Sequence, residues 1–526
     1  MRKTNWLSLI IFIAIIVFVN LVSITIFTRM DLSKGKIYSL SKSSKEAVRN
    51  LEDRLVVKAY FSKNLPGEFA DARRFANDLL SEYQAYSRGK LRFEFLDPSD
   101  ENRLKEEARK NQISPVSMRV VENDKLEIRE VYMGLAFLYQ DKTEAIPLIQ
   151  NTRGLEYDIT STIKKVTAIG LKKLAFFEID AQPEIPQMQG MQPPPGEFST
   201  VRQFISDNYE LIKTDLFSEI EPLVSALVFT GIQDSLSEVQ LYNLDQYLMT
   251  GGNIIFFQDR INANLQVQQA EPIASNLFNL LRSWGIQIKD NLVLDANCGQ
   301  VQVQRQQGIF RFATPVNYPF FPIINNVNKE NLMVKNLDQM QLIFASEIDT
   351  TRINEGQNFE PLLFTSQNSG QVRAPNLDIQ VASYMNRNLA PMLTESPKVV
   401  AGIFSGVFKS FFADNYNFPD AVKETSSAKV LFITDSDFIK DSGGAGLKGN
   451  LDFVMNAVDY MASESTLIEI RSRETEFKPL KELSIGTRKI VKWLNILFPS
   501  ILLIIFGVFH YRKEINRRKI LGELYE

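Results

Sequence analysis

Short acidic and hydroxyl side chains follow several predicted strands, and these residues are the best placed to do chemistry. Asp435, Ser436 and Asp437 come directly after the apolar run KVLFIT, and Asp259 follows the run NIIFF. The carboxyl ends of parallel strands meet at one edge of a sheet, where open α/β folds bind ligands. The sequence therefore predicts a candidate ligand site at that edge, made of Thr230, Gly231, Asp259, Asp435, Ser436 and Asp437.

Two interpretations of these carboxylates remain open. Some phosphatases carry an aspartate nucleophile after a strand, but they have Thr or Val two residues after the second Asp, with a Gly between. Phe438 and Ile439 follow Asp437 here. Asp is also common in turns and helix caps, and we favour that structural role over a ligand or metal site. We expect no metal and no cofactor.

Residue counts argue against most catalytic mechanisms. The only histidine is His510, near the C-terminal end, so the body of the chain cannot form a Ser-His-Asp triad or a His-ligated zinc site. Val228-Phe229-Thr230-Gly231 occupies the place where amidotransferase-like folds carry a nucleophilic cysteine, and this run has no cysteine. The Gly-rich run SGGAGLKGN is not a phosphate loop, because Gly449 follows Lys448 where Ser or Thr is required. The sequence predicts a protein without catalytic residues.

Two α/β regions are expected to position these side chains. In the first, Leu55–Phe61 and Leu91–Leu96 are predicted strands separated by a helix over Glu68–Tyr86, with further strands downstream. This order resembles a thioredoxin-like fold, but Phe61-Ser62-Lys63-Asn64 stands where a redox Cys-x-x-Cys would lie.

The second region has the clearest strand–helix–strand unit. Ala226–Thr230 and Asn253–Phe257 are predicted buried strands around an amphipathic helix over Leu236–Met249, which Gly251-Gly252 ends. This spacing predicts a parallel pair with a right-handed crossover. Between about residues 300 and 397 the pattern weakens, and we expect an insertion with antiparallel strands.

Two apolar runs lie near the ends of the chain. Leu7–Thr28 carries no charge, and Trp493–Phe509 is flanked by basic residues. A helix of about 20 apolar residues crosses a hydrocarbon core, so both are predicted transmembrane helices. The expected residues at the membrane interface are Trp6, Arg29, Trp493, Tyr511 and Arg512. The basic tails favour cytoplasmic termini, although basic residues also flank the spans on the other side.

Composition narrows the class of partner. The chain has 526 residues and a net charge of −3, which gives no reason to expect nucleic acid as a partner. The single cysteine, Cys298, excludes an internal disulfide.

Several stretches in order resemble the gliding-motility-associated GldG family. They are DLSKGKIYSLS, LEYDITSTIKKV, LDQYLMTGGNIIFFQD, LFITDSDF and GNLDFVMNAVDYM. The resemblance implies an auxiliary or substrate-binding component of an ABC transporter, with a periplasmic body, two spans in the bacterial inner membrane and cytoplasmic termini. It also implies a separate permease, a separate ATPase and no catalytic residues, and it leaves gliding or another export task open.

The expected architecture is α/β, with a non-catalytic amidotransferase- or flavodoxin-like domain behind the thioredoxin-like one. The expected function is a non-enzymatic subunit that couples to, or recruits a substrate or partner for, the permease and ATPase. The alternative is a membrane-anchored solute- or glycan-binding module, with an envelope protein or glycan as partner. The expected segments are an anchor at 1–30, the thioredoxin-like domain at 31–150, a connecting helix at 151–170, the larger α/β domain at 171–465, a linker at 466–488, a span at 489–511 and a basic tail at 512–526.

Overall fold

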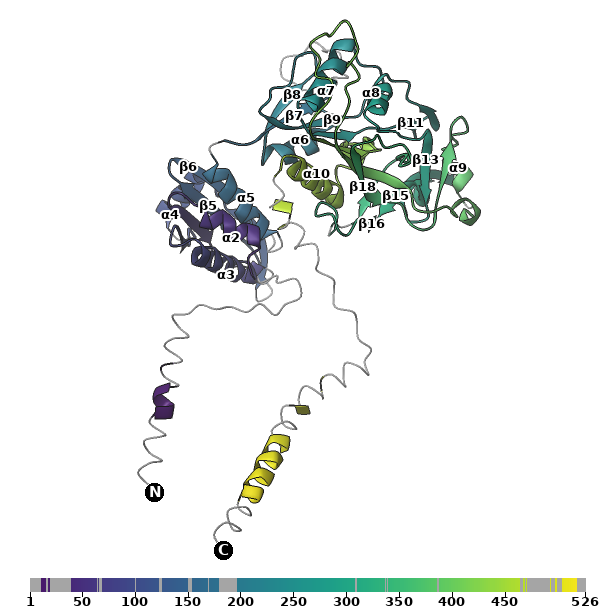
Figure 1. Cartoon of the computed structure of the whole chain (residues 1–526). Coiled ribbons are helices and arrows are strands. Elements are labelled where there is room, and N and C mark those ends of the chain that lie inside the picture. Colours follow the sequence, from purple (N-terminus) through teal and green to yellow (C-terminus); the bar gives the residue numbers. More distant parts are fainter. Residues whose placement is uncertain are drawn as a thin grey trace. The chain divides into compact units, whose positions relative to one another are not determined.

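The computed structural model of the chain has two compact units, Met1–Glu476 and Phe477–Glu526. The first unit is mixed α/β, with several separate sheets (Figure 1). The structure describes residues 11–15, 18, 39–63, 65, 69–99, 101–122, 125–149, 154–168, 170–178, 196–307, 310–335, 337, 339–385, 387–463, 467–468, 470, 492, 497–498 and 504–517.

The prediction of two transmembrane helices is wrong for the described part of the chain, where no helix is long and apolar enough to cross a membrane. In the second unit, residues 504–517 are helical, but charged residues from Arg512 onward interrupt the apolar stretch. That helix includes the predicted interface residues Tyr511 and Arg512. Trp6, Arg29, Trp493 and most of the run Leu7–Thr28 lie outside the described residues.

The N-terminal region of the first unit is a four-stranded sheet with helices. Its sheet has the order β2-β1-β5-β6, in which β1 and β2 are parallel and β5 is antiparallel to both β1 and β6. The hairpin β3–β4 forms a separate two-stranded sheet. The elements are α2 (Lys42–Arg49), β1 (Leu55–Phe61), α3 (Ala70–Tyr86), β2 (Leu91–Leu96), α4 (Asn102–Lys110), β3 (Val116–Glu122), β4 (Lys125–Val131), β5 (Met133–Tyr139), β6 (Lys142–Ile146) and α5 (Leu155–Thr167).

Alternate apolar side chains of this sheet pack against its helices. Val57, Ala59 and Phe61 of β1 point into one core with Leu80 of α3 and Ile159 of α5. Each of these side chains is buried, so the helices cover that face and shield it from water.

The larger region is built on an eight-stranded sheet of order β16-β18-β20-β21-β10-β9-β7-β8. Strands β21, β10, β9, β7 and β8 are parallel, and β20, β18 and β16 follow as antiparallel neighbours. Their bounds are β7 (Lys173–Phe177), β8 (Glu210–Thr214), β9 (Val224–Thr230), β10 (Ile254–Phe257), β16 (Asn326–Val327), β18 (Gln357–Phe364), β20 (Val399–Gly406) and β21 (Ala428–Ile433).

Helices cover both faces of this sheet, because its parallel strands are apolar on both sides. On β21, Leu431 packs into the core shared with α6 and α10, and its neighbour Phe432 packs into the core shared with α7 and α8. The helices are α6 (Ser199–Ser206), α7 (Glu238–Met249), α8 (Leu277–Ser283), α9 (Val381–Tyr384) and α10 (Lys448–Met461), with 3-10 turns η2 (Ala390–Met392) and η3 (Asp437–Ile439).

Local sequence signals define α7. Ser237 caps its N-terminus in a reciprocal capping box with Gln240, and Gly251 follows its end at φ +95°. A positive φ is easy only for glycine, so Gly251 allows the sharp exit into β10.

Smaller antiparallel sheets form the rest of the larger region. The pairs are β11–β12 and β13–β19, and β14, β15 and β17 form a three-stranded sheet. Tyr318, Phe320 and Phe344 are the aromatic centre of the core that these strands share. The bounds are β11 (Ile261–Asn264), β12 (Gln269–Pro272), β13 (Asn291–Asp295), β14 (Cys298–Gln307), β15 (Phe310–Ile324), β17 (Met340–Gln341) and β19 (Ser369–Arg373).

Candidate functional site

The predicted site residues do meet at the carboxyl ends of β9, β10 and β21. In the sheet register Phe257 lies beside both Thr230 and Ile433, so the residues that follow these positions share one edge. We call Thr230, Gly231, Asp259, Asp435, Ser436 and Asp437 the carboxyl-edge cluster. Asp295 also ends a strand but lies elsewhere, because β13 pairs with β19 and, among the residues that the structure describes, is not part of the eight-stranded sheet.

Asp259 and Ser436 form two hydrogen bonds with each other at the centre of the carboxyl-edge cluster. The Ser436 N–H donates to Asp259 Oδ1 at 2.8 Å, and the Ser436 hydroxyl donates to Oδ2. Gly231 packs against them so tightly that an added Cβ would lie 2.5 Å from Ser436 Cβ. Burial, and then the nearby Asp437 carboxylate, raise the pKa of Asp259 to about 6.

Asp435 is fully buried and accepts hydrogen bonds from two backbone N–H groups, one in its own turn and one in a distant segment. Its Oδ1 accepts from the Phe438 N–H at 3.0 Å, and its Oδ2 accepts from the Ile343 N–H. Burial raises its pKa well above the usual range, and the carboxylates of Asp259 and Asp437 add to this effect. Asp435 therefore caps the turn and fastens it to the 339–349 segment.

The outer members of the carboxyl-edge cluster are also paired. Asp437 binds Lys440 at 2.8 Å, and Thr230 donates its hydroxyl hydrogen to the Phe177 carbonyl at 2.7 Å. Burial alone would lower the pKa of Lys440, but Asp437 and Asp259 outweigh it and the pKa is raised. Lys440 therefore stays charged and offsets the acidic groups.

This arrangement favours the structural interpretation of the carboxylates. Each carboxylate described above accepts hydrogen bonds from its own turn, from a neighbouring backbone or from Lys440. Within the described residues no group of three or more His, Cys, Asp or Glu side chains could hold a metal ion. The predicted site residues lie together, and their hydrogen bonds and ion pair connect the carboxyl ends of three strands.

Two buried polar residues outside the predicted site hold neighbouring parts of the fold together. Gln258 is fully buried and exchanges two hydrogen bonds with the backbone of Ile232, each 2.9 Å long. Asp245 of α7 is fully buried and accepts from Trp284 Nε1 at 3.0 Å and from the Ser410 hydroxyl at 2.6 Å. An acid on the apolar side of a predicted helix was the available signal for Asp245.

An open groove lies further along the same edge of the sheet. It has a volume of about 810 Å³ and lies between the ends of β7 and β8 and the start of α7. Its acidic lining is partly neutralised, since Glu178 pairs with Arg202 at 3.0 Å and Glu221 with Lys173 at 3.2 Å.

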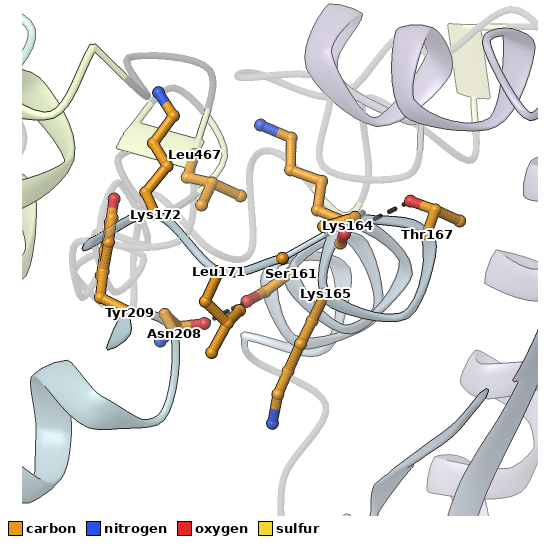
Figure 2. A pocket seen from close by; sticks show the side chains of 11 residues that line it. Ser161, Lys164, Lys165, Thr167, Leu171, Lys172, Asn208, Tyr209 and Leu467 are labelled. Carbon is orange, nitrogen blue, oxygen red and sulfur yellow. Dashed lines mark hydrogen bonds between the residues drawn. The ribbon is translucent and has the colours of Figure 1, made fainter. Parts of the chain in front are cut away.

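A smaller pocket, of about 330 Å³, lies where α5 leads into β7 (Figure 2). Ser161 of α5 donates a hydrogen bond to the Asn208 side chain across it, at 2.5 Å. Figure 2 shows the ammonium groups of Lys164 and Lys165 pointing in opposite directions, and Lys172 Nζ donates to the Ala462 carbonyl at 2.8 Å. The lysines therefore do not converge on a shared anion, and the pocket is a joint between α5 and the larger region.

Comparison with known proteins identifies the larger region. Residues 172–457, more than half of the chain, match the family described as an ABC-type uncharacterized transport system, and its family name marks it as auxiliary. The chain belongs to this family. An accessory role in an ABC transport system follows from that membership. Residues 34–138 match a second family, a domain of unknown function (DUF7088).

Two individual proteins are also similar to this chain. An uncharacterized protein of Borreliella burgdorferi is 24% identical over 522 residues, which cover 97% of each chain. A solved structure, the mmIFT52 N-terminal domain, matches 55% of this chain and 97% of its own length, with 10% identity and a TM-score of 0.31.

Proposed function

We propose that this chain is a non-enzymatic, GldG-type accessory subunit that couples an extracytoplasmic body to a separate permease and a separate ATPase. The observation that carries the proposal is the family match over residues 172–457. The resemblance to GldG supports a task in gliding motility or in another form of export, and it supports a periplasmic position for the body.

The geometry of the carboxyl-edge cluster supports coupling over solute binding or catalysis at that edge. Asp259 and Asp435 are engaged by Ser436, Ile343 and Phe438. An open α/β sheet that binds a solute at its edge needs polar groups free to contact it. The cluster instead makes the sheet edge rigid, which suits a body that transmits movement.

Affinity purification of the tagged full-length chain from its native membranes, followed by mass spectrometry, tests the proposal. We expect a multi-span permease and an ATPase with a Walker motif in stoichiometric amounts. The matched control is Asp437→Asn, which removes the ion pair with Lys440 and should leave this recovery unchanged. Recovery of the chain without either transporter subunit would refute the coupling role.

A second measurement tests the position of the body. Protease added to intact spheroplasts should cleave the 196–463 region if the body is periplasmic. Cleavage only after lysis would place the body in the cytoplasm and contradict this part of the proposal.

A further inference from the structure

A third cavity lies in the antiparallel part of the larger region, apart from the carboxyl-edge cluster. It has a volume of about 660 Å³ and lies between β14, β15 and the segment from Tyr384 to Leu393. This volume falls in the range of small-molecule sites, which extends from about 300 to 1,000 Å³.

One wall of the cavity is apolar. Val316 and Pro319 come from β15, and Met385, Leu389 and Leu393 come from the facing segment. Val316, Leu389 and Leu393 also pack against the aromatic core around Tyr318. A wall held in this way is formed before any ligand arrives, so a ligand with an apolar body would bury surface without ordering the protein.

The lining of this cavity carries one acidic side chain, Asp295, and one cationic side chain, Arg387. Arg387 lines it, is exposed, and has no ion pair or hydrogen bond with another residue that the structure describes. The acid in the lining, Asp295, is fully buried and already accepts from the Ser366 N–H and hydroxyl, both at 2.6 Å, and from the Asn297 N–H at 2.8 Å. A cation would find no free carboxylate oxygen at Asp295, whereas an anion can pair with Arg387.

We propose that this cavity binds a small amphipathic anion. The apolar body of the ligand lies against Val316, Pro319, Met385 and Leu389, and its carboxylate or sulfonate group pairs with the guanidinium of Arg387. The site goes beyond the proposed coupling function and does not depend on it, because it rests on a different part of the fold.

Cys298 gives the site its own reporter. It is the only cysteine in the chain, and it lines the cavity. Iodoacetamide is uncharged, so its reaction with Cys298 in the full-length chain reports access to the cavity and can be followed by intact mass. Burial and the neighbouring Asp295 raise the pKa of the thiol, so the reaction is run near pH 9.

The probe is naphthalene-2-sulfonate, and its uncharged partner is naphthalene-2-methanol. We expect the sulfonate to slow alkylation of Cys298 at concentrations about tenfold lower than the alcohol, which is ~1.4 kcal/mol of preference for the charge. In Arg387→Gln the two compounds should protect equally, while the rate without a probe stays that of the wild type. Arg352→Gln removes an exposed arginine outside the cavity and should keep the preference.

A second variant tests the apolar wall. Leu389→Ser should weaken protection by both compounds alike, because it removes apolar contact without changing charge. Failure of the sulfonate to protect Cys298, or an unchanged preference in Arg387→Gln, would overturn the proposal. Neither result would affect the proposed function, which rests on recovery of the permease and ATPase.

Discussion

Replacing Asp259 by Asn should make the stability of the larger region less dependent on pH. Burial and Asp437 raise the pKa of Asp259 to about 6, whereas an unfolded aspartate titrates near ~3.9. The folded state therefore binds this proton more tightly than the unfolded state. The contribution of Asp259 to stability is present in full below about pH 4 and is lost as the pH rises through about 6.

The magnitude follows from the difference between these pKa values. For a fully buried carboxyl group, this pKa difference would correspond to ~3 kcal/mol of lost stability above pH 7. Asp259 is partly exposed, and Lys440 lies nearby, so we expect about 1–2 kcal/mol. Asn can keep both contacts with Ser436, since its amide oxygen accepts from the N–H and its amide nitrogen can donate to the hydroxyl.

The assay is urea unfolding of wild type and Asp259→Asn at pH 3.5 and pH 8, followed by circular dichroism. The variant should equal the wild type at pH 3.5, below the unfolded pKa, and exceed it by about 1–2 kcal/mol at pH 8. Asp234→Asn, at an exposed position, is the control and should match the wild type at both values. The same pH dependence in Asp259→Asn and wild type would refute the electrostatic account of the cluster.

Three further substitutions test separate contacts by the free energy of unfolding. Asp245→Ala should cost about 3 kcal/mol or more, because it leaves the Trp284 N–H and other buried donors unpaired; a cost below ~1 kcal/mol would contradict this. Gly231→Ala should cost about 1–3 kcal/mol through its clash with Ser436, and a neutral result would show that the turn can move aside. Ser237→Ala should cost about 1 kcal/mol by removing the cap of α7, and unchanged stability would mean that water replaces the cap.

The strand–helix–strand unit around α7 could be predicted from the sequence because its signals are local. The apolar runs, Ser237 and the Gly251-Gly252 stop lie within a few residues of the elements that they define. The structure places α7 at Glu238–Met249, within two residues of the predicted start at Leu236 and with the same end. The parallel pairing of β9 and β10 follows from the length of the crossover.

The state of the carboxyl-edge cluster could not be predicted in the same way. The meeting of Thr230, Asp259 and Asp435 follows from strand order, but the groups that satisfy them do not. Asp435 is held by Ile343, 92 positions away in the chain, and Asp259 by Ser436, 177 positions away. Such contacts depend on tertiary packing, which leaves no periodic trace in the sequence.

The apolar runs at the two ends of the chain show a different limit of sequence reasoning. Hydropathy gave two spans, yet the helix over 504–517 combines an apolar half with a charged half. A window average over the run Trp493–Phe509 does not register that charged residues from Arg512 onward share a helix with the apolar residues before them.

The measurement that tests the central claim most directly is ATP hydrolysis by the purified permease and ATPase, with and without the full-length chain. If the chain is a coupling subunit, its addition should change the rate of hydrolysis severalfold and saturate at a fixed stoichiometry. Asp437→Asn should give the same change, because the carboxyl-edge cluster is structural. A rate that does not respond to the wild-type chain at any ratio would contradict the account.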